Sequence, residues 1–312
     1  MSFEFINSLG KKRKPFLFIS DFMAQNIDVI LLEDLEKENI AFSIDEKYTY
    51  KKHSHFLKKR SINFSEYSTR FDAIIEEIKA GNSYILNLTQ ATEIQTTLTL
   101  NEIYSLSNAH YKLYYKDKFV CFSPEKFIQI KDATIHTFPM KGTIDASLIN
   151  AEKKILTDEK EMAEHIMIVD LLRNDLSIVA KDVKVEKFRY ITEIEAGEKK
   201  LLQVSSHISG KLQENWHKNL GTILKALLPA GSISGAPKRS TLEILQRVEG
   251  YDRGHFSGVF GLYNGESFDS GVMIRFIEKT ADGFIYKSGG GITLDSDVRL
   301  EYEELQDKIY LP

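Results

Sequence analysis

Segments with strand character follow one another along much of this sequence instead of alternating strictly with helices, and this order most limits the folds open to the chain. Two short apolar runs flank Ser123-Pro124-Glu125, and three more lie at 258–263, 271–278 and 284–287. Antiparallel strands can be joined by short turns, whereas parallel strands need long crossover connections. We therefore expect an α+β fold with antiparallel sheets.

Helices are indicated where apolar residues recur at three- and four-residue spacing. Four are expected, at 65–81, 157–176, 237–248 and about 297–308. In the second of these, Asp158 and Glu161 form a capping pair, and Met162, Ile166 and Val169 form one apolar stripe.

Composition excludes several classes of protein. The chain has 312 residues, with 41 basic and 45 acidic side chains and a net charge of −4, which argues against a nucleic-acid binder. Its one cysteine, Cys121, fits a reducing compartment and the interior of a strand. No apolar run reaches the roughly 18 residues of a membrane span, and the first residues lack a signal-peptide pattern. We expect a cytoplasmic enzyme that binds neither nucleic acid nor membrane.

Two predicted helices carry pairs of glutamates. Glu161 and Glu164 share one face of the helix at 157–176, and Glu301, Glu304 and Lys308 share one face of the last helix. Carboxylate oxygens are the ligands that Mg²⁺ prefers. The spacing allows a magnesium site, but it also allows two ordinary solvated helix faces.

Lys141 lies in the run Phe138-Pro-Met-Lys-Gly-Thr143, which predicts a tight turn. A partly buried lysine has a lowered pKa and can act as a nucleophile or base at neutral pH. The alternative is a surface lysine in a β-turn.

Small residues suggest two sites for an anion. The loop 229–238 runs into a helix N-terminus, where free N–H groups can bind an anion, although it lacks the glycine and Lys-Ser/Thr spacing of a P-loop. Gly289, Gly290 and Gly291 form a second possible backbone cradle near Arg275. A plain turn and a surface ion-pair residue are the alternatives.

Taken together, these motifs resemble those of the chorismate-utilising enzymes. The matching runs, in the family's order, are YILNLTQ (84–90), SPEKF (123–127), PMKGT (139–143), DEKEMAEHIMIVDLLRNDL (158–176), the loop 229–238, GGGIT (289–293) and the acidic segment 295–304. The resemblance implies antiparallel β-sheets packed as a sandwich with flanking helices. It also implies a catalytic domain at 61–312 after a shortened accessory segment at 1–60.

The resemblance also implies the roles of the site residues. Glu164 and Glu304 would bind Mg²⁺ directly, and Glu161 and Glu301 would hold its waters. The residues implied to contact chorismate are Gly142, Thr143, Ser234, Arg275, Gly289, Gly290, Gly291 and Lys308.

Lys141 implies one branch of this family. Lysine before Gly-Thr is similar to the aminodeoxychorismate synthases, in which the lysine adds covalently to chorismate, Glu125 protonates the leaving hydroxyl, and ammonia enters at C4. The ammonia would come from a glutamine amidotransferase subunit, and the product would serve 4-aminobenzoate and folate synthesis.

Three other positions bear on the branch. Ile85 stands where isochorismate and salicylate synthases have a water-activating lysine, which disfavours those activities. Gln203 replaces a histidine associated with pyruvate elimination, so we expect a separate lyase to complete that step. Phe256 stands where a substrate-contacting tyrosine is often found. Anthranilate synthase component I and a non-catalytic anion-binding member of the fold are the alternatives.

Overall fold

The computed structural model describes residues 2–45, 55–196 and 199–312, and the chain forms two compact units, each described by itself. The first unit comprises Met1–Pro15, Lys126–Leu228 and Leu262–Ser270, and the second comprises Phe16–Glu125, Pro229–Gly261 and Gly271–Pro312. Strands β14 (Val259–Tyr263) and β15 (Phe268–Val272) contribute residues to both units. The division at residue 60 stays a prediction.

The first unit contains an antiparallel sheet in which β10, β12, β9 and β8 are neighbours in that order, and β11 also pairs with β12. Its strands are β8 (Lys126–Lys131), β9 (Thr134–Thr137), β10 (Met140–Asp145), β11 (Lys181–Ala196) and β12 (Lys199–Lys211). The register between β10 and β12 shifts between Met140 and Thr143.

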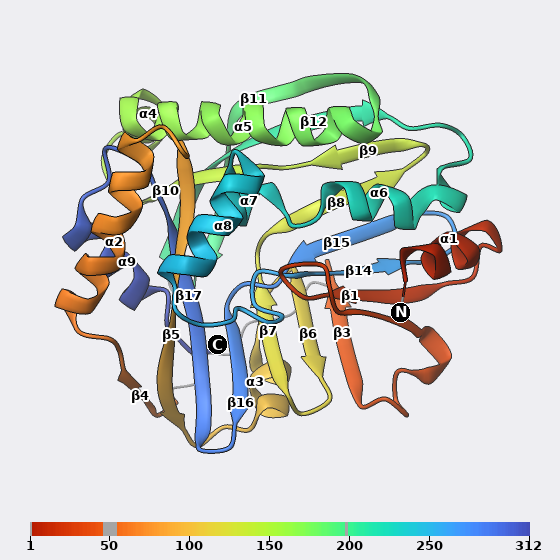
Figure 1. Ribbon diagram of the computed structural model, residues 1–312, viewed down its shortest axis with the longest axis horizontal. Coiled ribbons are helices and arrows are strands. Elements are labelled where there is room, and N and C mark those ends of the chain that lie inside the picture. The colour runs from red at the N-terminus through yellow and green to blue at the C-terminus, as the bar shows by residue number, and fades with distance from the viewer. Residues whose placement is uncertain (1, 46–54, 197–198) are drawn as a thin grey trace. The chain divides into compact units, whose positions relative to one another are not determined.

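Helix α5 (Glu159–Val179) lies along this sheet (Figure 1). The Asp158 side chain accepts a hydrogen bond from Glu161 N at 2.9 Å, which confirms the predicted cap. The predicted apolar stripe is wrong in part, because Ile166 is 49% exposed. Glu164 and His165 lie on the buried face instead. The packed face of α5 therefore carries charged and polar side chains among its apolar ones.

The remaining helices of the first unit are α1 (Phe3–Lys11), α4 (Ala151–Thr157), η2 (Trp216–Asn219) and α6 (Leu220–Leu227). Helix α1 packs against η2 and α6. Asn7 Oδ1 accepts a hydrogen bond from Gly221 N at 2.8 Å. A Cβ on Gly221 would lie 1.9 Å from Phe3 O, so this approach requires glycine.

The second unit contains an eight-stranded antiparallel sheet with the order β13, β5, β17, β16, β7, β6, β3, and with β4 paired to β5. Its strands are β3 (Ile40–Ile44), β4 (Leu57–Arg60), β5 (Ile85–Thr96), β6 (Tyr111–Tyr115), β7 (Phe119–Ser123), β13 (Gly235–Ala236), β16 (Phe276–Thr280) and β17 (Gly283–Ile292). Strands β1 (Phe16–Ser20) and β2 (Ile27–Leu31) pair with each other in the same unit.

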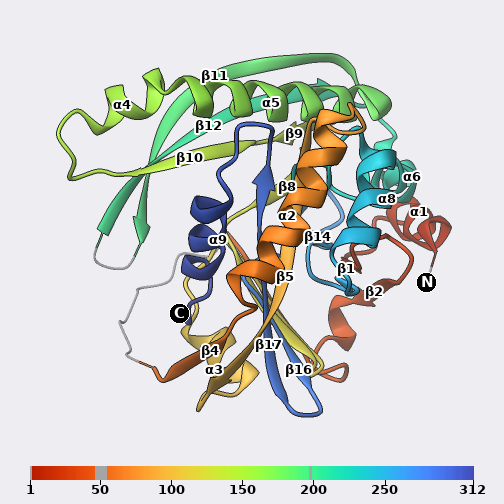
Figure 2. The same cartoon turned by 60° about the vertical axis from the view of Figure 1, so that its left-hand side comes forward.

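Helices α2, α8 and α9 of the second unit pack beside β5 and β17 (Figure 2). The helices of this unit are η1 (Leu32–Asp34), α2 (Phe64–Lys79), α3 (Leu100–Leu106), α7 (Gly231–Ser234), α8 (Lys238–Val248) and α9 (Val298–Asp307). Within the described residues, no helix has both the length and the apolar character needed to cross a membrane.

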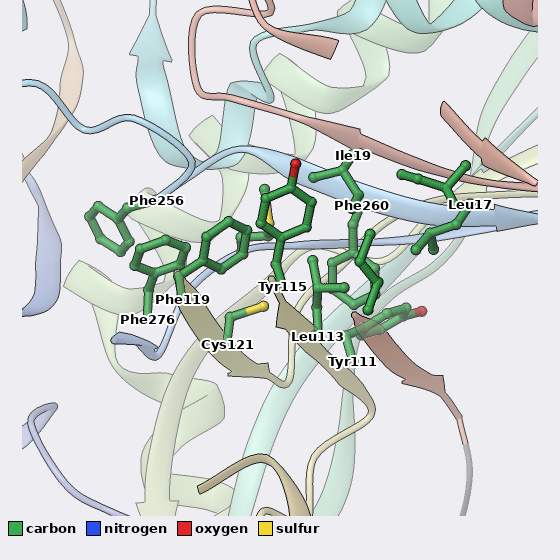
Figure 3. Packing of buried hydrophobic residues seen from close by; sticks show 13 residues of the cluster. Leu17, Ile19, Tyr111, Leu113, Tyr115, Phe119, Cys121, Phe256, Phe260 and Phe276 are labelled. Carbon is green, nitrogen blue, oxygen red and sulfur yellow. The ribbon is translucent and has the colours of Figure 1, made fainter. Parts of the chain in front are cut away.

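A core of the second unit is built from side chains of β1, β3, β6, β7 and β16 (Figure 3). Cys121 is fully buried in it, as the sequence predicts. Phe256 occupies the position where a substrate-contacting tyrosine is often found. It is 2% exposed and packs on Phe276, with 5.9 Å between the ring centroids. Phe256 therefore contributes to the core.

The predicted α+β class with antiparallel sheets is confirmed. The strand expected at 271–278 is wrong, because β15 ends at Val272 and β16 begins at Phe276. Arg275 lies between them with φ of +52°. Left-handed backbone lies outside the strand region, and at this arginine it coincides with the break between β15 and β16.

Candidate active site

In the first unit, Lys141 lies in a bulge of strand β10 rather than in the predicted tight turn. The register shift between Met140 and Thr143 falls at this lysine. The next residue, Gly142, has φ of +84°, a conformation that glycine adopts without strain. Bulges redirect side chains, and here Lys141 Nζ lies 2.5 Å from Glu164 Oε2 of α5. The Glu164 side chain is 7% exposed and that of Lys141 is 28% exposed.

Glu161, one helical turn before Glu164, has a buried oxygen with no hydrogen-bond partner among the described residues. That atom is Oε2, and a Cβ on Gly142 would lie 2.8 Å from it. Burial raises the pKa of Glu161, and the Glu164 charge raises it further, while Lys141 lowers it. A buried carboxylate oxygen without a donor fits a cation or its water as the missing partner.

In the second unit, α9 presents the other glutamates. Glu301 Oε1 accepts a hydrogen bond from Ser296 Oγ at 2.8 Å, and Glu304 Oε1 lies 2.7 Å from Lys308 Nζ. Glu304 is 59% exposed. Neither unit, in its described residues, gathers three or more His, Cys, Asp or Glu side chains into a metal site. The four-glutamate magnesium site stays a prediction, and each unit supplies one pair.

The glycine triplet lies at the end of β17, in register with β5. Lys308 Nζ donates to Gly289 O at 2.8 Å. A Cβ on Gly290 would lie 3.2 Å from Glu301 Oε2 and 3.7 Å from Lys308 Nζ. The absence of a side chain therefore lets the strand backbone run beside a carboxylate and an ammonium group.

Glu125 belongs to the same unit and is partly buried. Burial raises its pKa, while the hydrogen bond from Ser232 and the charges of Arg275 and Lys308 lower it. Ser232 Oγ donates to Glu125 Oε1 at 2.5 Å. A carboxyl with a raised pKa keeps its proton to a higher pH than an ordinary carboxyl and can give it to a leaving group.

The other predicted substrate residues differ in exposure and contacts. Arg275 is partly buried and its Nε donates to Tyr310 Oη at 3.2 Å. The Ser234 hydroxyl is fully buried and donates to Ala230 O at 3.0 Å. Thr143 is exposed and pairs with Gln203 across β10 and β12. The charges of Arg275 and Lys308 both lower the pKa of Glu125, whereas the Ser234 hydroxyl is directed into its own turn.

Sequence reasoning missed Ser232 and Ser296, which hold Glu125 and Glu301. Ser232 lies in the loop 229–238 and Ser296 lies in the acidic segment 295–304, and both segments belong to the motifs identified in the sequence. A hydrogen bond between a serine and a carboxylate produces no periodic pattern in the sequence. The pairing of these serines with Glu125 and Glu301 is therefore seen only in the fold.

Comparisons with known proteins place the chain in one family. The sequence pattern of the family described as chorismate binding enzyme matches residues 14–311. A Haemophilus influenzae protein called an uncharacterized PabA-like protein is 48% identical over 98% of this chain and 94% of its own length. Aminodeoxychorismate synthase component 1 of Bacillus subtilis is 29% identical over 78% of this chain and 54% of its own length. The crystal structure of anthranilate synthase component I from Streptococcus pneumoniae matches with a TM-score of 0.69 and 25% identity, over 91% of this chain and 68% of that one.

Proposed function

Because this chain belongs to the family of chorismate-binding enzymes, we propose that it aminates chorismate at C4 to give 4-amino-4-deoxychorismate, as component I of an aminodeoxychorismate synthase. The observation that carries the proposal is the bulge that directs Lys141 at Glu164. A nucleophilic amine needs a fixed position. The bulge and the contact with Glu164 give Lys141 such a position.

Lys141 would act as a covalent nucleophile. Its amine adds to C2 of the ring, the two ring double bonds shift, and the C4 hydroxyl leaves as water after it takes a proton. Ammonia then adds to C4, the double bonds shift back, and the lysine amine is expelled from C2. Each of the two displacements uses a positioned nucleophile.

Glu125 would supply the proton for the leaving hydroxyl. Its raised pKa favours the protonated form, and Ser232 fixes the orientation of the carboxyl. Positioned acids of this kind typically accelerate a reaction about 10²–10⁴-fold.

Mg²⁺ is the proposed cofactor. Glu164 and Glu304 would bind it and Glu161 and Glu301 would hold its waters, which agrees with the unpartnered Glu161 oxygen. When bound, the metal neutralises carboxylate charge and polarises the group it contacts. The glycine triplet, Arg275 and Lys308 would bind the second carboxylate of the substrate.

The proposed partners follow from this reaction. Ammonia would come from a glutamine amidotransferase subunit. Because Gln203 replaces a histidine at the position associated with pyruvate elimination, a separate lyase would convert the product to 4-aminobenzoate. We propose that the reaction takes place in the cytoplasm.

Product analysis tests the proposal. The purified chain is incubated with chorismate, Mg²⁺ and ammonium, with and without a 4-amino-4-deoxychorismate lyase, and products are separated by chromatography. We expect 4-aminobenzoate only when the lyase is present. Anthranilate or isochorismate would contradict the proposal, and anthranilate would make this chain an anthranilate synthase component I.

A second experiment tests the covalent step. Lys141→Ala removes the amine, so we expect loss of most chorismate consumption, while far-ultraviolet circular dichroism stays unchanged. Lys160→Ala, at an exposed position near the start of α5, is the control and retains activity. Full activity of Lys141→Ala would rule out catalysis through this residue. A non-catalytic member of the fold would be favoured if Lys141→Ala and Glu164→Gln both left the biological function of the chain unchanged.

A further inference from the structure

A buried ion pair lies just beyond the end of α8 in the second unit. Glu249 and Arg253 are 3% and 2% exposed. Arg253 Nε donates to Glu249 Oε2 at 2.8 Å, and Arg253 Nη2 donates to Glu249 Oε1 at 2.6 Å. Desolvating two charges is costly and often leaves a buried pair with no net stabilising effect. The contacts of this pair therefore matter more than its own attraction.

Both members of the pair bond to the backbone of strand β5. Thr89 N donates to Glu249 Oε1 at 2.8 Å, and Arg253 Nη2 donates to Asn87 O at 2.5 Å. Backbone groups of residues two apart face the same edge of a strand. The ion pair thus supplies the donor and the acceptor that a neighbouring strand would supply at this edge.

The same guanidinium also holds a second segment. Arg253 Nη1 donates to Ile233 O at 3.1 Å, within the short helix α7. Ile233 lies between Ser234 and Ser232, the serine that donates to Glu125. One side chain therefore joins β5 to the turn that orients the proposed general acid.

The part of β5 held in this way faces the glycine triplet. Asn87 is in register with Gly291 and Thr89 with Gly289. A Cβ on Gly289 would lie 2.6 Å from Thr89 Cγ2 and 2.9 Å from Asn87 Oδ1. A shift of β5 at these two residues would therefore move the backbone of the triplet.

We propose that Glu249 and Arg253 are positioning residues that hold β5 and α7 in place and thereby set the affinity of the glycine triplet for the carboxylate of the substrate. The inference rests on the proposed function. Only the planar fork of arginine reaches Glu249, Asn87 O and Ile233 O together. A lysine in its place keeps the charge but lacks the fork.

The variant Arg253→Lys tests this role by steady-state kinetics. Losing one positioning contact, on the order of 1.4 kcal/mol, predicts a rise of about tenfold in KM for chorismate. The KM for ammonium should change less than about threefold. A merely structural role would lower the amount of folded enzyme, and so the apparent kcat, without moving KM.

Arg70→Lys is the matched control, because the hydrogen bond that Arg70 makes to β5 within the described residues goes to the side chain of Gln90, at 2.7 Å, and not to the backbone. We expect its KM for chorismate to equal that of the wild type. Thr89→Val is the second variant, and it tests the positioning role if Arg253→Lys fails to fold. It removes the hydroxyl that donates to Glu249 at 2.7 Å and keeps the Thr89 N–H, so KM should rise by a smaller factor.

Amide hydrogen exchange separates this inference from the proposed function, because it is measured without substrate. We expect faster exchange at residues 87–89 in Arg253→Lys than in the wild type and in Arg70→Lys. Equal exchange, or a KM for chorismate within twofold of wild type, overturns the positioning role. A wild-type chain that does not consume chorismate contradicts the proposed function, while exchange still decides whether the pair holds β5.

Discussion

Ser232 controls the protonation of the proposed general acid through a single hydrogen bond. It donates to Glu125 and favours the carboxylate, which opposes the rise in pKa caused by burial. An acid catalyst is active when protonated, so activity should fall as the pH rises through the pKa of Glu125. Ser232→Ala removes the donor, raises that pKa further, and should move the alkaline limb of the kcat/KM profile to higher pH.

The pH–rate profile of Ser232→Ala is compared with that of Ser240→Ala, which removes an exposed hydroxyl bonded to Asn82 O. The control should follow the wild type. A shift of the alkaline limb to lower pH in Ser232→Ala would contradict the assignment of Glu125 as the acid.

Two features of the structure require glycine at position 142, and a pair of variants can separate their effects. Its φ of +84° would cost an L-residue about 1–2 kcal/mol, and its Cβ would meet the unpartnered oxygen of Glu161. Gly81 has a similar φ of +78° with open space around it. Both Gly142→Ala and Gly81→Ala should therefore lose similar stability in urea unfolding.

Only Gly142→Ala should also raise the Mg²⁺ concentration needed for half-maximal activity, because it displaces Glu161. Equal Mg²⁺ requirements in the two variants would argue against Glu161 as a residue that holds the waters of the metal.

At the scale of elements, His217 makes the attachment of α1 sensitive to acid. Arg13 Nη1 lies 3.1 Å from His217 Nδ1 and can only donate, so this nitrogen accepts and the ring is neutral. Burial and the Arg13 charge lower the pKa of His217 to about 4. The unfolded value is about 6.5, so stability is present above pH 6.5 and is lost as the pH falls toward 4.

Because of His217, the wild type should lose about 2 kcal/mol of its free energy of unfolding between pH 7 and pH 5. The variant His217→Gln should lack this loss. The free energy of unfolding is measured in urea at both pH values. Lys218, an exposed neighbour of His217 in η2, provides the control Lys218→Gln, which keeps the histidine and should keep the pH dependence of the wild type. Equal slopes for wild type and His217→Gln would show that this histidine does not lower stability in acid.

The elements with strong periodicity could be predicted from sequence, and those shaped by tertiary contacts could not. Helices α2, α5, α8 and α9 lie near their predicted ranges, because spacing and caps are local signals. The break at Arg275 and the bulge at Lys141 are invisible in apolar alternation. The spacing also allowed a solvated face for Glu164, whereas its pairing with Lys141 lets this glutamate lie on the packed face of α5.

The residues of the candidate site also divide into those that the sequence identified and those that it did not. The glutamates, the lysine and the glycine triplet were identified by residue type and motif. Glu249 and Arg253 were not identified, because four-residue spacing at a helix end is typical of an exposed ion pair. Only the fold shows that both are buried and that their partners are backbone atoms of β5 and α7.

At the scale of the whole molecule, the two units are interleaved along the chain. Residues 262–270 complete the first unit, and residues 271–312 complete the second. When the ribosome has added residue 261, neither unit has all its strands. Lys141 is then already synthesised, but the glycine triplet and α9 are not. A chain synthesised to residue 261 therefore holds the proposed nucleophile without the glycine triplet, Arg275 and Lys308, and catalytic competence also requires the residues that follow.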